Sequence, residues 1–136
     1  MPHLRTYHVF ISHSWDYSEP YKTVKSWLDE TPLFCWADYS VPISNPLDTK
    51  SNVELQHKIR QKISLCSCVV ILSGMYVAYS KWIDYEINAA IELNKPIIGV
   101  RPWGQERVPL MVQNNATVMI GWNSSSLVQA IRDYAI

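Results

Sequence analysis

One carboxylate stands among residues that should face a hydrophobic core. Glu86 lies in the segment Ser80–Asn94, where advancing by about 100° per residue places it on an apolar arc. A carboxylate on such a face is costly to desolvate unless a partner or ligand binds it, so we expect a functional role. The alternative is a structural role, in which Glu86 bonds a nearby hydroxyl or caps another helix. The rest of the arc consists of Trp82, Ile83, Ile87, Ala89, Ala90, Ile91 and Leu93.

Polar groups that could bind a ligand follow the first predicted strand, Tyr7–Ser12. The sequence Ser12-His13-Ser14-Trp15-Asp16 supplies hydroxyls, an imidazole and backbone amides just before a predicted helix, which suits a phosphate. Helix capping or turn chemistry explains these serines and Asp16 about as well. We take Ser12, His13 and Trp15 as candidate substrate-binding residues, with Trp15 placed to contact a planar ring.

The elements that would position these residues alternate along the chain. Five apolar runs predict strands at Tyr7–Ser12, Leu33–Ala37, Ser67–Ser73, Pro96–Arg101 and Thr117–Ile120. Helical patterns cover Ser18–Glu30, Ser51–Leu65, Ser80–Asn94, a short segment at Val108–Asn114 and the residues from Ser124 onward. We therefore predict an α/β fold of the flavodoxin-like kind, a three-layer sandwich. Its five-stranded parallel sheet should have the order 2-1-3-4-5, with helices on both faces and ligands at the carboxyl ends of the strands.

A long irregular segment, Asp38–Lys50, follows the second predicted strand. It is broken by Pro42 and Pro46 and exceeds most connections in compact α/β domains, so we expect a lid, a ligand-binding segment or a partner contact. Asp38 begins this segment and is a further candidate substrate-binding residue.

Length and charge limit the classes of function. The 136 residues suit one domain, 1–136, that can bury a hydrophobic core without disulfides or a structural metal. Twelve basic residues balance twelve acidic ones, which argues against nucleic acid as the main partner. No run of eighteen apolar residues predicts a membrane span, and Met1–Thr6 lacks the apolar stretch of a secretory signal. We expect a cytoplasmic protein.

The sequence lacks several common nucleotide-binding and metal-binding motifs. Four glycines form neither a dinucleotide-binding fingerprint nor a phosphate-binding P-loop. The histidines are scattered, and the Cys66-Ser-Cys68 spacing does not suit zinc, so we expect no metal site. We expect Cys35, Cys66 and Cys68 to be buried free thiols.

Several motifs resemble one family. Tyr7-His-Val-Phe-Ile-Ser12 resembles the opening strand of Toll/interleukin-1 receptor (TIR) domains. Ser80-Lys-Trp82-Ile-Asp-Tyr-Glu86 is similar to their tryptophan-to-glutamate helix motif, with the same four-residue step. Pro96–Gly104 and Gly121-Trp-Asn-Ser resemble a TIR-like subfamily of small bacterial proteins, which includes the signal-producing component of Thoeris anti-phage defence. Ile83 departs from the pattern, because many TIR domains have cysteine there.

The resemblance implies an enzyme that uses NAD as a substrate and needs no cofactor. It would cleave the bond between nicotinamide and ribose, with Glu86 catalytic, and produce a cyclic ADP-ribose-type messenger for a separately encoded effector protein. Trp82, one helical turn before Glu86, would either stack on a substrate ring or belong to the core. The family also implies that self-association through TIR-type surfaces is an option.

The chemistry of NAD explains why one carboxylate can be sufficient. Most glycosidases use two, because an alkoxide leaving group needs a proton. Nicotinamide leaves as a neutral molecule, so the remaining task is to stabilise a cationic sugar, which a poorly solvated carboxylate does well. Two alternatives stay open: a non-enzymatic TIR-type interaction module that docks through Asp38–Lys50, and a deoxyribosyltransferase-like enzyme.

Overall fold

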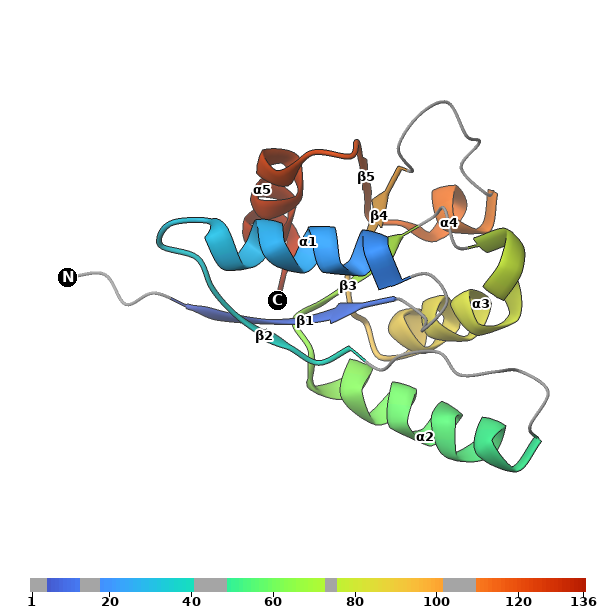
Figure 1. Ribbon diagram of the computed structural model, residues 1–136. Coiled ribbons are helices and arrows are strands. Elements are labelled where there is room, and N and C mark those ends of the chain that lie inside the picture. The colour runs from blue at the N-terminus through green and yellow to red at the C-terminus, as the bar shows by residue number, and fades with distance from the viewer. Residues whose placement is uncertain (1–4, 13–17, 41–48, 73–75, 102–109) are drawn as a thin grey trace.

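The computed structural model describes residues 5–12, 18–40, 49–72, 76–101 and 110–136. In these residues strands and helices alternate along the chain (Figure 1). The strands are β1 (Thr6–Ile11), β2 (Cys35–Asp38), β3 (Cys68–Leu72), β4 (Ile97–Val100) and β5 (Val118–Ile120). The helices are α1 (Ser18–Glu30), α2 (Thr49–Leu65), α3 (Tyr76–Glu92), α4 (Leu110–Asn115) and α5 (Ser124–Tyr134).

The strands form one parallel sheet in the order β2-β1-β3-β4-β5. The predicted fold class and strand order are confirmed. β3 is central and buried along its whole length, as its continuous apolar run indicates. The main difference in boundaries is at α3, which begins at Tyr76, one turn earlier than the predicted Ser80.

Side-chain alternation divides the core between the two faces of the sheet. Phe10 and Ile71 point to the face covered by α2, α3 and α4, and we call the cluster there the α3-side core. Val9, Ile11 and Val70 point to the opposite face, covered by α1 and α5, which we call the α1-side core. Figure 1 shows α1 and α5 on one side of the sheet and α2 and α3 on the other.

Local signals explain where several helices begin and end. Asn123 caps α5, and its side chain accepts a hydrogen bond from the Ser126 amide at 3.0 Å. After α3, Asn94 adopts a left-handed conformation with φ of 57°, and Lys95 donates back to the Ala90 carbonyl at 2.8 Å. This turn brings the chain from α3 into β4.

Two predictions of burial are wrong. Ile91 is 47% exposed. It lies seven residues after the polar residue Asp84, almost two full turns, so it projects from the same outer side of α3. Cys35 is exposed, because β2 is an edge strand. Cys66 and Cys68 are buried free thiols, as predicted. No helix in the described ranges has the length and apolar character needed to cross a membrane.

Candidate functional site

Glu86 lies on the inner side of α3 and is fully buried. The neighbouring turns contribute the buried side chains of Ile83, Ile87 and Ala90, so the predicted placement on an apolar face is confirmed. Neither carboxyl oxygen has a hydrogen-bond partner within the described part of the chain. For the structural explanation of Glu86, a bond to a nearby hydroxyl or helix end, the described residues offer only the Ser12 hydroxyl, which influences Glu86 without reaching hydrogen-bond geometry.

Ser12 lies immediately after β1, and its side chain faces the side of the sheet that α3 covers. Its amide donates to the Val70 carbonyl of β3 at 2.9 Å, which fixes its backbone at the carboxyl end of the sheet. Because side chains alternate along a strand, Ser12 points to the same face as Phe10, the face covered by α3. The side chain is fully buried, and its hydroxyl has no hydrogen-bond partner among the described residues.

Burial controls the protonation of Glu86. Desolvation raises the pKa of this carboxyl from 4.5 to about 8, and the nearby Ser12 hydroxyl opposes the rise. Their geometry falls short of a hydrogen bond, so Ser12 moderates the pKa without cancelling the effect of burial. At neutral pH the free protein therefore holds Glu86 mainly as the neutral acid. An approaching cation would favour the carboxylate.

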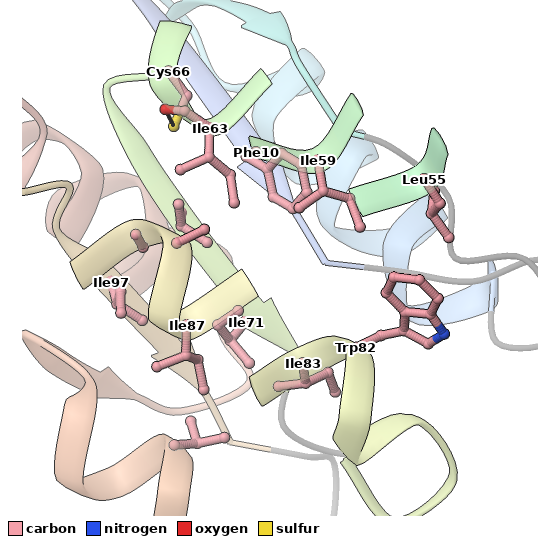
Figure 2. Packing of buried hydrophobic residues seen from close by; sticks show 14 residues of the cluster. Phe10, Leu55, Ile59, Ile63, Cys66, Ile71, Trp82, Ile83, Ile87 and Ile97 are labelled. Carbon is pink, nitrogen blue, oxygen red and sulfur yellow. Dashed lines mark hydrogen bonds between the residues drawn. The ribbon is translucent and has the colours of Figure 1, made fainter. Parts of the chain in front are cut away.

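Trp82 is 1% exposed and belongs to the α3-side core. Figure 2 shows its ring beside Leu55 of α2, with the indole nitrogen turned away from the other labelled residues. That N–H is buried and has no acceptor in the described segments, a state that costs about 1–3 kcal/mol for a typical polar group. Trp82 is thus a core residue whose indole N–H has no acceptor among the residues that the structure describes.

Asp38 ends β2 and is exposed, with both carboxyl oxygens already engaged. One accepts from the Tyr21 hydroxyl of α1, and the other accepts from the Ser40 amide at 2.9 Å. The Ser40 hydroxyl in turn accepts from the Ile11 amide at 2.8 Å. The sequence analysis did not identify Tyr21 or Ser40 as partners, because no spacing rule links residues on different elements. Asp38 therefore holds the ends of β1 and β2 against α1, and a substrate would have to compete for it.

His13 and Trp15 lie outside the described residues, as does most of the Asp38–Lys50 segment. Their proposed contacts with substrate remain predictions. Within the described ranges, Ser12 and Glu86 meet beneath the carboxyl end of β1, and Trp82 lies one turn away on α3.

The described residues contain no group of three histidine, cysteine or acidic side chains that could hold a metal ion. Burial raises the pKa of Cys66 to about 11, which keeps its thiol protonated. Among the described residues, the site offers one carboxyl group, one hydroxyl and one indole N–H. These groups can donate hydrogen bonds to sugar hydroxyls and accept hydrogen bonds from them, and the carboxylate can stabilise a positive charge.

A family model described as the Thoeris protein ThsB, TIR-like domain, matches residues 10–107. The matched span contains Ser12, Trp82 and Glu86. It confirms the resemblance seen in the first-strand and helix motifs.

Two solved structures are similar to the chain over most of its length. The Clostridium botulinum CMP N-glycosidase BcmB is 16% identical with a TM-score of 0.55, over 92% of this chain and 98% of that chain. A 3-dehydroquinate dehydratase-like protein from Bifidobacterium longum is 15% identical with a TM-score of 0.45, over 90% of each chain. The likeness to BcmB concerns the fold alone. No curated protein matches the chain.

Proposed function

The chain belongs to the family of Thoeris ThsB TIR-like domains, and on this premise we propose that it cleaves NAD at the nicotinamide–ribose bond. Glu86 is the catalytic carboxylate in this proposal. The product is a cyclic ADP-ribose-type messenger, which activates a separately encoded effector protein in anti-phage defence.

One observation carries the proposal: Glu86 is completely buried, yet neither oxygen is paired in the described residues. A structural carboxylate at such a position is normally satisfied by hydrogen bonds, because leaving it unpaired costs stability. Unpaired groups of this kind concentrate at functional sites, where a ligand supplies the missing partner. A ribose offers both hydroxyl donors for the carboxyl group and, in the transition state, a positive charge.

The reaction requires charge stabilisation more than proton transfer. When the C1–N bond breaks, its electron pair leaves with nicotinamide, and positive charge develops on the ribose C1 and ring oxygen. The Glu86 carboxylate would oppose this charge in a water-poor environment, where the attraction is much stronger than in bulk water. The messenger forms when an atom of the ADP-ribose itself, instead of water, supplies the new electron pair to C1.

The raised pKa of Glu86 fits this sequence of events. The nicotinamide ring of NAD is cationic, so its arrival favours ionisation of Glu86 and releases a proton. Ser12 is the neighbour whose hydroxyl favours the carboxylate form. Binding of the substrate would therefore convert the neutral acid into the charged group that catalysis needs.

The experiment is incubation of the protein with NAD and chromatographic separation of nicotinamide, ADP-ribose and cyclic products. Glu86→Gln keeps the shape of the neutral acid and removes the charge, so turnover should fall by at least about a hundredfold. Glu92→Gln is the matched control, because Glu92 lies on the same helix, is exposed and pairs with Arg60 on the surface. Turnover in Glu92→Gln should equal that of the unchanged chain. Full activity in a folded Glu86→Gln protein would refute the proposal.

A second candidate is hydrolysis of an N-glycosidic bond in a nucleotide whose base is not cationic. The fold is shared with the CMP N-glycosidase BcmB. A Glu86 pKa of about 8 would let the neutral acid protonate a departing base. The two candidates differ in pH dependence. Turnover that needs the carboxylate rises in kcat/KM up to about pH 8, whereas turnover that needs the acid falls above about pH 8.

A further inference from the structure

The carboxyl end of β1 is held from both of its neighbours in the sheet. On one side, the Ser12 amide donates to the Val70 carbonyl of β3 at 2.9 Å. On the other side, the pairing of β1 with β2 extends to Val9, and two residues later the Ile11 amide donates to the Ser40 hydroxyl at 2.8 Å. Two consecutive amides are thus fixed from opposite sides. Because peptide groups are planar, this restricts how the backbone of Ser12 can turn.

The Ser40 hydroxyl belongs to a run of three hydrogen bonds that begins on α1. The Tyr21 hydroxyl donates to one carboxyl oxygen of Asp38, and the Ser40 amide donates to the other at 2.9 Å. Burial and the bond to Asp38 raise the pKa of Tyr21, so its hydroxyl remains a donor at physiological pH. The bond from Ile11 to Ser40 completes the run. The first turn of α1 is therefore connected to the end of β1 through Asp38 and Ser40.

Ser12 carries this connection into the candidate site. Burial raises the pKa of Glu86, and the Ser12 hydroxyl lowers it. The titratable side chains of the α3-side core, which are Cys66, Tyr39 and Tyr85, are not among the causes of the Glu86 shift. The effect of a hydroxyl on a carboxylate depends steeply on distance and direction. The position of the end of β1 therefore bears directly on the ionisation of Glu86.

A second serine on the same strand shows what a merely structural hydroxyl would look like. The Ser67 hydroxyl accepts a hydrogen bond from the His8 amide at 3.3 Å, near the middle of β1. Ser40 and Ser67 thus both support amides of β1. Only Ser40 does so at the residue next to Ser12, so only Ser40 is placed to influence Glu86 through the strand.

We propose that Ser40 is a positioning residue that fixes the end of β1 and so holds the Ser12 hydroxyl near Glu86. Asp38 and Tyr21 orient the Ser40 hydroxyl for this task. The catalytic meaning of the role rests on the proposed function, in which Glu86 ionises when NAD binds. Ser40 acts through Ser12 and makes no contact with the substrate.

The first measurement needs no substrate. The nuclear magnetic resonance signal of the Glu86 carboxyl carbon, assigned through Glu86→Gln in protein made with labelled glutamate, is followed as pH changes. It should titrate near pH 8 in the unchanged chain. Ser40→Ala should raise the midpoint, so that the ionised fraction at pH 7 falls about twofold to fivefold. Ser40→Thr keeps a hydroxyl and should restore the original midpoint. Ser67→Ala, the matched control, should leave it unchanged.

A double substitution tests whether Ser40 acts through Ser12. Ser12→Ala alone should raise the pKa of Glu86 at least as much as Ser40→Ala does. Adding Ser40→Ala to Ser12→Ala should cause no further rise, because the group that Ser40 positions is already absent. Additive effects in the double variant would overturn the inference, as would an unchanged Glu86 pKa in folded Ser40→Ala protein.

Tyr21→Phe replaces Ser40→Ala in the same cycle if that variant does not fold. It removes one donor to Asp38 and should cause a smaller rise in the Glu86 pKa, which disappears in the Ser12→Ala background. No rise in Tyr21→Phe, or a rise that persists without the Ser12 hydroxyl, would overturn the inference.

Kinetics with NAD separate this inference from the proposed function. If Glu86 cleaves NAD, kcat/KM of Ser40→Ala at pH 7 should fall about twofold to fivefold and recover at higher pH, while Ser67→Ala is unaffected. A Ser40 effect on the Glu86 pKa that requires Ser12 supports the positioning role even if NAD is not cleaved. Cleavage that depends on Glu86, together with a Glu86 pKa that ignores Ser40→Ala, overturns the positioning role and leaves the proposed function in place.

Discussion

Each face of the sheet carries a buried hydrophobic cluster, but the two faces differ in how their polar groups are satisfied. On the α1 side, Trp36 is partly buried against the core, and its indole donates to Asp29 at the surface at 2.8 Å. All the buried side-chain polar atoms that lack a partner in the described residues belong to Ser12, Trp82 and Glu86, on the other face. The α1 side therefore supports the fold, whereas the α3 side also carries buried polar groups that have no partner in the described residues, as groups that bind a ligand often do.

The largest expected difference between the two faces is a pH dependence of stability that comes from Glu86 on the α3 side. Between pH 4.5 and about 8 the folded chain keeps a proton on Glu86 that the unfolded chain releases, so the free energy of unfolding falls as pH rises. The limiting slope is about 1.4 kcal/mol per pH unit. Glu86→Gln removes this pH dependence. The free energy of unfolding of the variant should therefore rise relative to that of the unchanged chain between pH 4.5 and about 8.

Urea unfolding of both proteins at several pH values measures this difference, and the contributions of other titrating groups cancel. The stability contributed by neutral Glu86 is complete below pH 4.5 and is lost as pH passes about 8. Parallel curves for the two proteins would mean that Glu86 is as well solvated in the folded state as in the unfolded state.

A cavity on the α1 side should reduce stability and spare chemistry. Leu28 of α1 is fully buried in the α1-side core, and Leu28→Ala should lower the free energy of unfolding by about 3 kcal/mol. Because no unpaired polar group lies there in the described residues, turnover per folded molecule should change less than about threefold. Denaturant unfolding and steady-state kinetics on the same sample test both statements. A large fall in turnover per folded molecule would show that the two faces are coupled.

The two tryptophans provide the smallest and most direct test. Trp36→Phe removes a donor that is bonded to Asp29 and should destabilise the fold by about 1 kcal/mol. Trp82→Phe removes a donor that has no acceptor in the described residues, so its loss of about 1–2 kcal/mol should come from the cavity that the smaller ring leaves in a fully buried site, with no loss of a hydrogen bond added. Thermal unfolding of the pair gives the comparison. A loss for Trp82→Phe well above about 2 kcal/mol would exceed the cost of the cavity and would indicate that its N–H is satisfied in solution.

Local patterns were sufficient to predict most of the architecture. The periodicity of α3 placed Glu86 on the apolar face, and the continuous apolar run of β3 marked a strand covered on both sides. Ile91 was misplaced because it lies at the edge of the arc, where periodicity alone does not decide between core and solvent. Cys35 was misplaced because its own strand does not show that it forms a sheet edge.

The sequence by itself determined the order of elements, the parallel sheet and the anomalous position of Glu86, because each follows from neighbours close along the chain. Only the tertiary structure decided that Glu86 meets Ser12, that Asp38 is occupied by Tyr21, and that the buried Trp82 N–H has no acceptor in the described residues. These facts depend on which distant segments fold against one another. Satisfaction of a buried polar group is a property of its surroundings in space, and side-chain periodicity carries no information about it.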